Sequence, residues 1–87
     1  MKQQTMTVLF YLNRAKTNQK GVFPIYCRIT FLKKRKQFST GQFVNPKHWS
    51  SKSQSVYTKD EHCNHINGQL SLITQKTNNT YLKLQLQ

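Results

Sequence analysis

The chain has 87 residues, with 14 Lys and Arg against 2 Asp and Glu, and a formal net charge of +12. This length predicts a single domain over residues 1–87 whose modest core cannot enclose a large dry catalytic cleft. So strong a positive excess favours a polyanionic partner such as duplex DNA, because a surface charged only for solubility usually mixes both signs.

The cysteines and the hydropathy pattern indicate a cellular compartment. Cys27 and Cys63 have neither disulfide-framework nor CxxC spacing, so two free thiols in a reducing cytoplasm are expected. No run approaches the length of a membrane span, and no signal-like segment follows residues 1–4. The sequence therefore predicts a soluble, cytoplasmic protein with no membrane partner.

Two apolar runs with period-two alternation predict strands over residues 5–12 and 22–32. Their apolar face would carry Met6, Val8, Phe10, Leu12, Ile25, Cys27, Ile29 and Phe31. The polar, basic segment 13–21 ends in Gly and predicts a hairpin connection. Pro24 cannot donate to a ladder, so it is expected at the start of its strand or at a bulge.

A third strand is predicted over residues 36–40, after a short basic turn at residues 32–35. Phe38 is expected to point inward, and Gly41 to mark a bend or bulge that ends regular pairing. The sheet would thus occupy about residues 5–44, followed by a turn over residues 45–49 that Trp49 closes as an apolar anchor.

The remaining residues predict a loop over 50–59 and a helix over about 60–86. Thr58 or Asp60 can cap this helix, and Asp60 and Glu61 complement its positive N-terminal end. One helix face would present Ile66, Leu70, Ile73, Thr77, Tyr81 and Leu84. The predicted fold class is α+β, a three-stranded antiparallel β-sheet packed against one C-terminal α-helix.

The sheet face that the helix leaves uncovered is the candidate binding surface. Its side chains, which can donate to phosphates or base edges, would be Tyr11, Tyr26, Arg28, Thr30, Gln37 and Ser39. Basic residues would lie at the two ends of the sheet, namely Arg14, Lys16, Lys20, Lys33, Lys34, Arg35 and Lys36. A narrow sheet can enter the major groove of DNA. Arg28 would then read guanine and Gln37 adenine, while Lys and Ser side chains hold phosphates. The alternative is an ordinary solvated sheet face.

Metal and catalytic sites are not predicted. Residues 62–65 (HCNH) crowd three ligand types into one turn, but no second cluster at finger spacing completes a zinc site. Polar, partly exposed residues at a helix start are the favoured interpretation. The adjacent acids Asp60 and Glu61 cannot oppose one another, and no nucleophile or phosphate-loop motif is present. The chain is therefore predicted to be no enzyme and to need no cofactor.

Three segments together resemble the arm-type DNA-binding domain at the N-terminus of bacterial tyrosine recombinases of phages and conjugative transposons. They are residues 21–30 (GVFPIYCRIT), 33–41 (KKRKQFSTG) and 44–49 (VNPKHW). The resemblance covers residues 5–49 well and the helical tail loosely. It implies a sheet that enters the major groove of arm-type sites, which lie away from the crossover site, during DNA integration.

The resemblance also implies roles for residues. The matching outward positions are Tyr26, Arg28, Thr30, Gln37 and Ser39, and the turn at residues 33–36 would lie against the DNA backbone. Catalysis would belong to a tyrosine-nucleophile domain outside these residues, and sister integrase protomers would be partners in the recombination complex.

Two other functions remain open. The chain could be a basic RNA-binding or ribosome-associated domain, although such readers usually stack bases on sheet aromatics and only Tyr11 and Tyr26 are available. It could also be a protein-interaction module whose sheet edge or helix docks another subunit.

Overall fold

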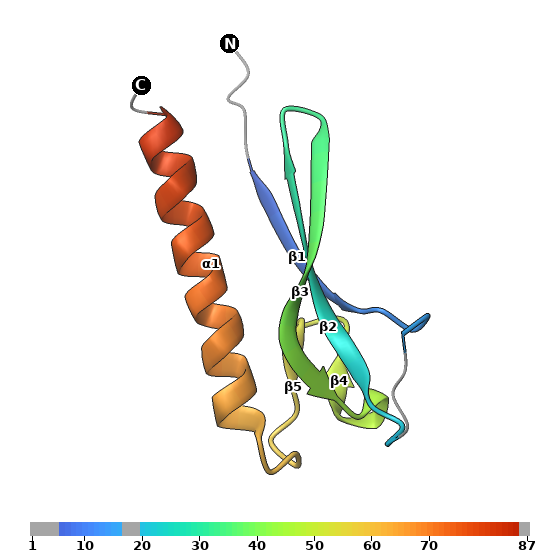
Figure 1. Cartoon of the computed structure of the whole chain (residues 1–87). Coiled ribbons are helices and arrows are strands. Elements are labelled where there is room, and N and C mark those ends of the chain that lie inside the picture. Colours follow the sequence, from blue (N-terminus) through green and yellow to red (C-terminus); the bar gives the residue numbers. More distant parts are fainter. Residues whose placement is uncertain (1–5, 17–19, 86–87) are drawn as a thin grey trace.

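The structure is a computed structural model that describes residues 6–16 and 20–85, with side chains up to residue 80. It contains a three-stranded antiparallel sheet in the order β1-β2-β3 and one C-terminal helix, α1 (Figure 1). The elements in chain order are β1 (Thr7–Leu12), β2 (Phe23–Phe31), β3 (Lys34–Val44), η1 (Pro46–His48), β4 (Trp49–Ser50), β5 (Ser55–Val56) and α1 (Cys63–Gln85). The predicted α+β class is confirmed. Residue 5, where the first strand was predicted to begin, lies outside the described residues.

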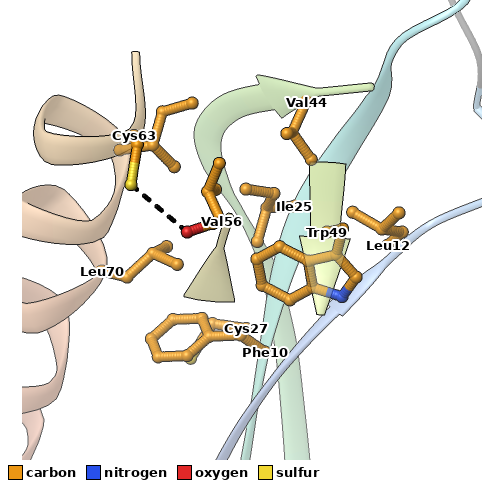
Figure 2. Close-up of a cluster of buried hydrophobic side chains, with 10 residues drawn as sticks. Phe10, Leu12, Ile25, Cys27, Val44, Trp49, Val56, Cys63 and Leu70 are labelled. Carbon is orange, nitrogen blue, oxygen red and sulfur yellow. Dashed lines mark hydrogen bonds between the residues drawn. The ribbon is translucent and has the colours of Figure 1, made fainter. Parts of the chain in front are cut away.

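One buried cluster joins the sheet, the short β4–β5 hairpin and the helix (Figure 2). Its members are Phe10, Leu12, Ile25, Cys27, Val44, Trp49, Val56, Cys63, Ile66 and Leu70. Phe10 pairs with Cys27 across β1 and β2, and paired residues share a face, so α1 covers this face of the sheet. The predicted anchoring role of Trp49 is confirmed, since only 6% of the residue is exposed.

The β2–β3 turn is shorter than predicted. Only Leu32 and Lys33 form it, and both have positive φ, 54° and 66°. This is the geometry of a two-residue type I′ hairpin loop, whose twist matches that of the flanking strands. β3 therefore starts at Lys34 rather than at residue 36, and the prediction of a turn over residues 32–35 was wrong at its end.

Gly41 lies in a bulge within β3, where its φ is +82°. The ladder steps from Tyr26 opposite Ser39 to Pro24 opposite Phe43, so β3 carries two extra residues there. The bulge prediction is confirmed, but pairing resumes as far as Val44, so the predicted end of pairing was wrong. Pro24 lies beside this irregularity, at one of the two places predicted for it.

Phe38 shares the face of its partner Cys27 but remains 38% exposed and lies outside the core. Phe38 points inward, as predicted, but it is not buried. β3 is an edge strand of the sheet, so Phe38 has a neighbouring strand on one side only.

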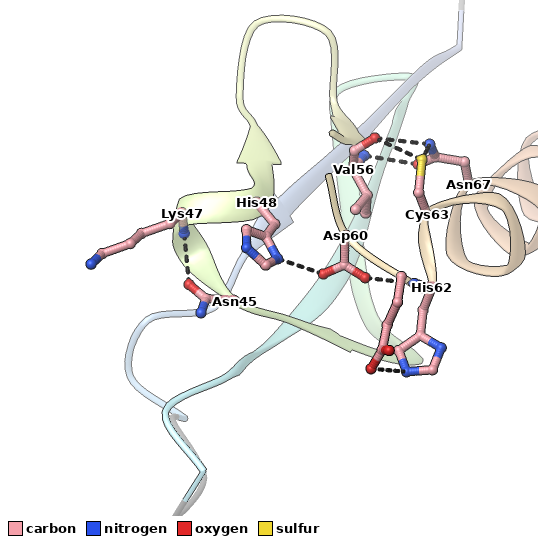
Figure 3. Close-up of polar contacts among 9 residues, drawn as sticks. Asn45, Lys47, His48, Val56, Asp60, His62, Cys63 and Asn67 are labelled. Atoms are coloured by element: carbon pink, nitrogen blue, oxygen red, sulfur yellow. Dashed lines mark hydrogen bonds and ion pairs between the residues drawn. The ribbon is translucent and has the colours of Figure 1, made fainter. Parts of the chain in front are cut away.

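The predicted loop over residues 50–59 contains a small hairpin instead. Trp49 pairs with Val56, and Ser50 pairs with Ser55. Asn67 of α1 continues this pairing, because its side chain accepts from the N–H of Val56 at 2.8 Å and donates to the Val56 carbonyl at 3.1 Å. The hairpin is thereby joined to the helix (Figure 3).

Helix α1 begins at Cys63, three residues later than predicted. Asp60 lies just before it, and its Oδ1 accepts from the N–H of His62, the residue that precedes the helix, at 2.8 Å. Cys63 is buried and its thiol donates to the carbonyl of Val56 at 3.3 Å, so the prediction of a partly exposed helix start was wrong for this residue. Ile66 and Leu70 are buried as predicted, whereas the side chains of Tyr81 and Leu84 lie outside the description. No helix in the described part of the chain is long and apolar enough to cross a membrane.

Candidate nucleic-acid interface

The sheet face opposite α1, here called the outer face, is ordered into three rows by the strand register. The rows are Tyr11–Tyr26–Ser39, Leu9–Arg28–Gln37 and Thr7–Thr30–Arg35. All six side chains predicted to point outward therefore lie on one face. The register also adds Arg35, which sequence reasoning had assigned to the turn.

Arg28 occupies the centre of the outer face. Its guanidinium carbon lies 5.0 Å from the centroid of the Tyr11 ring, within the range of a cation–π contact. Its Nε atom is buried, and no hydrogen-bond partner for it is present among the described residues. The ring thus holds the cation in place while one donor of the guanidinium stays unsatisfied.

Tyr11 also contacts the third strand. Its hydroxyl donates a hydrogen bond to Oε1 of Gln37, which is opposite Arg28 in the register. The rings of Tyr11 and Tyr26 lie 6.1 Å apart between centroids, at an interplanar angle of 49°. One tyrosine from β1 therefore holds a side chain of β2 and a side chain of β3.

The β1–β2 connection adds cations at one end of the sheet, Lys16 on the outer face and Arg14 beside Phe23, which packs against the core. The ammonium of Lys16 donates to the hydroxyl of Tyr26 at 3.0 Å and lies 5.5 Å from the centroid of that ring. This hydrogen bond raises the pKa of Lys16 above its ordinary value. The guanidinium of Arg14 lies 5.5 Å from the ring of Phe23. Both cations are thus carried on aromatic rings of β2.

The basic run at residues 33–36 is divided by the register. Lys33 lies in the turn and Arg35 on the outer face, whereas Lys34 and Lys36 pair with Phe31 and Ile29 on the side of the sheet that faces α1. The predicted single basic turn was therefore wrong: alternation along a strand sends successive side chains to opposite faces. All four residues are exposed.

Both acidic residues lie away from the outer face, just before α1 (Figure 3). Asp60 pairs with Nδ1 of His48 at 2.7 Å, and Glu61 pairs with Nε2 of His62 at 3.3 Å. The hydrogen bond from His48 is the main cause that lowers the pKa of Asp60. The outer face therefore carries cations and neutral polar groups without any carboxylate.

The HCNH segment is not gathered into a site. Cys63 points into the core while His62 and His65 are exposed. Within the described ranges, no three or more His, Cys, Asp or Glu residues are grouped so that they could hold a metal ion. Burial raises the pKa of the Cys27 thiol to about 11, as expected for a thiol that packs in the core.

Comparison with known proteins gives one match. A family model described as an arm DNA-binding domain matches residues 10–87, which include the whole candidate interface except Thr7 and Leu9. No curated protein and no solved structure matches the chain significantly.

Proposed function

The chain belongs to the arm DNA-binding domain family and is a DNA-binding domain; we propose that it reads duplex DNA by placing its outer face in the major groove of arm-type sites. One observation carries this proposal. The outer face combines Arg28 and Gln37 in its central row with cations at both ends, and it carries no carboxylate. Such a face presents hydrogen-bond donors to base edges and positive charge to both phosphate backbones.

The proposal gives the residues different roles. Arg28 and Gln37 read bases, because they lie in the middle of the face and have side chains that recognise base edges. Tyr26, Thr30 and Ser39 flank them on the same face and contact bases or phosphates.

The cations would follow the DNA backbone. Arg14 and Lys16 lie at one end of the sheet, and the β2–β3 hairpin carries the others at the opposite end, namely Lys33, Lys34, Arg35 and Lys36. Because the hairpin bears cations on both faces, it can approach phosphates on either side of the groove.

The proposal extends to the parent protein. We infer a tyrosine recombinase of a mobile genetic element, in which this domain binds arm sites and a separate domain cuts and joins DNA. Sister protomers would then assemble on the same DNA. The support for this step is the segment resemblance together with the family match.

The RNA-binding alternative is less well supported by the geometry. Of the aromatic rings on the outer face, Tyr11 and Tyr26 each already have a cation against them, Arg28 and Lys16 respectively, which leaves Phe43, paired with Pro24 and 47% exposed, as the ring without such a cation. Rings occupied in this way are poor platforms for the base stacking on which sheet-based RNA readers depend.

Selection from a random duplex DNA pool at about 150 mM salt tests the proposal, with a random RNA pool as competitor. We expect a short enriched DNA motif. A bound DNA pool without enrichment, or preferential capture of RNA, would contradict it.

A further inference from the structure

Tyr11 determines which atoms of Gln37 can reach DNA. A glutamine amide has an acceptor arm, Oε1, and a donor arm, Nε2. The Tyr11 hydroxyl donates to one of the two lone pairs of Oε1, so the acceptor arm is turned toward β1. The donor arm is left for a partner outside the protein.

The hydroxyl is well fixed in this position. The ring of Tyr11 packs against the Arg28 guanidinium on one strand and near the Tyr26 ring, so its orientation is restricted before Gln37 is engaged. A hydrogen bond formed by groups that are already held in place loses little side-chain entropy. Exclusion of water from a groove would strengthen the bond further.

This orientation decides which bases fit. Bidentate recognition of adenine needs both arms of glutamine, since Oε1 accepts from the amino group N6 and Nε2 donates to N7. With Oε1 turned toward β1 by Tyr11, the central row of the outer face presents the donors of Arg28 beside the donor of Gln37. Donors match the keto oxygens O6 of guanine and O4 of thymine, and they leave the amino groups of adenine and cytosine unpaired.

We propose that Tyr11 is a positioning residue that sets the specificity of the outer face, so that Arg28 and Gln37 together select two keto-bearing bases. Arg28 takes guanine, and Gln37 takes guanine or thymine in place of the adenine expected from residue type alone. The inference rests on the proposed function, because it specifies which duplex sequence the same face selects.

The experiment repeats the duplex selection with four proteins, the original chain and the variants Gln37→Ala, Tyr11→Phe and Tyr26→Phe. Gln37→Ala identifies the base position that Gln37 reads, as the position where preference is lost. Tyr11→Phe removes only the hydroxyl and keeps the ring beneath Arg28. Tyr26→Phe is the matched control, because it removes a hydroxyl from the same face that bonds Lys16 instead of Gln37.

We expect the original chain to prefer guanine or thymine at the Gln37 position. In Tyr11→Phe, the preference for these bases over adenine should fall on the order of tenfold, with the guanine at the Arg28 position retained. Tyr26 is itself proposed to contact DNA, so the affinity of Tyr26→Phe is not the readout; its base preference at the Gln37 position should be unchanged. Fluorescence of the buried Trp49 checks that each variant is folded.

Several outcomes would overturn the inference while the proposed function stands. One is that the original chain prefers adenine at the Gln37 position, and another is that Gln37→Ala loses its base preference at no position. A third is that Tyr11→Phe selects the same motif as the original chain. The last is that Tyr26→Phe shows the same shift in base preference as Tyr11→Phe. If the original chain enriches no motif, the proposed function fails and the inference fails with it.

Discussion

The guanidinium of Arg28 is held against a ring of the neighbouring strand, with one donor buried and unpaired within the described part of the chain. Its contact with the Tyr11 ring restricts the side chain before DNA arrives, while its Nε has no partner among the described residues. A restrained side chain gives up less conformational entropy on binding than one that moves freely in solvent. Arg28 is therefore suited to discriminate between bases, whereas the exposed lysines of the hairpin are suited to follow phosphates.

Substitution of Arg28 and Lys34 should separate these two roles. Arg28→Ala should cost about 1–3 kcal/mol on the selected duplex and relax preference at one position. Lys34→Ala should weaken binding to all duplexes alike and reduce the slope of log K against log salt by about one. Titrations of matched and mismatched duplexes at several salt concentrations measure both effects. Identical behaviour of the two variants on every sequence would show that the division of roles is wrong.

At the scale of elements, the bulge in β3 interrupts the regular pairing of β2 with β3. Gly41 adopts a φ of +82°, and the hydroxyl of Thr40 donates to the Ile25 carbonyl at 2.7 Å where the ladder is irregular. A Cβ built on Gly41 would meet no atom within 4 Å, so its need for glycine is conformational and not steric. The helical Gly68 has equally open surroundings, without a positive φ.

These two glycines give a matched pair of substitutions. Gly41→Ala should lower the free energy of unfolding by about 1–2 kcal/mol, because an L side chain is disfavoured at that φ. Gly68→Ala should raise it by about 0.5–1 kcal/mol, because alanine is the better helix former. Urea unfolding followed by Trp49 fluorescence measures both changes. Equal effects of the same sign would contradict this account of the bulge.

The start of α1 should make stability depend on pH. Asp60 accepts from His48 and from the N–H of His62, and these bonds hold its pKa below the ordinary value of 3.8. A carboxyl whose pKa is lower in the folded state stabilises the fold above its unfolded pKa, and this contribution is lost as pH falls through the folded pKa.

Asp60→Asn should therefore be less stable than the original chain at neutral pH, and the difference should shrink as pH falls from about 5 to 2. Glu61→Gln is the control, because the Glu61 side chain is 86% exposed, and its substitution should change stability by less than about 0.5 kcal/mol. Chemical unfolding at a series of pH values provides the comparison. A stability difference for Asp60→Asn that persists at pH 2 would contradict the assignment.

Sequence patterns predicted β1 and β2 because each has one face that packs on the core, whereas β3 is exposed over most of its length and its start was missed. Period-two alternation was enough to place Tyr26, Arg28 and Gln37 together on the outer face. The β4–β5 hairpin was not predicted, because strands of two residues are too short to show an alternation of apolar and polar residues. The bond between Tyr11 and Gln37 could not be predicted either, since it depends on the register of three strands and hence on two turns.

At the scale of the whole molecule, charge is segregated. The chain has a net charge of +12, and its two acids both lie before α1 beside histidines. The apolar core lies between the sheet and the helix, and the outer face carries polar and basic side chains together with tyrosines, Leu9 and Phe43. The same alternation that builds the core therefore also builds the proposed DNA-binding surface.

The most direct test of this account is an NMR titration of the labelled protein with the selected duplex at about 150 mM salt. We expect the largest chemical-shift changes at the outer-face positions of β2 and β3, including the side-chain groups of Arg28 and Gln37. Changes concentrated on the exposed side of α1 or on the β4–β5 hairpin, with the outer face unaffected, would contradict the central claim.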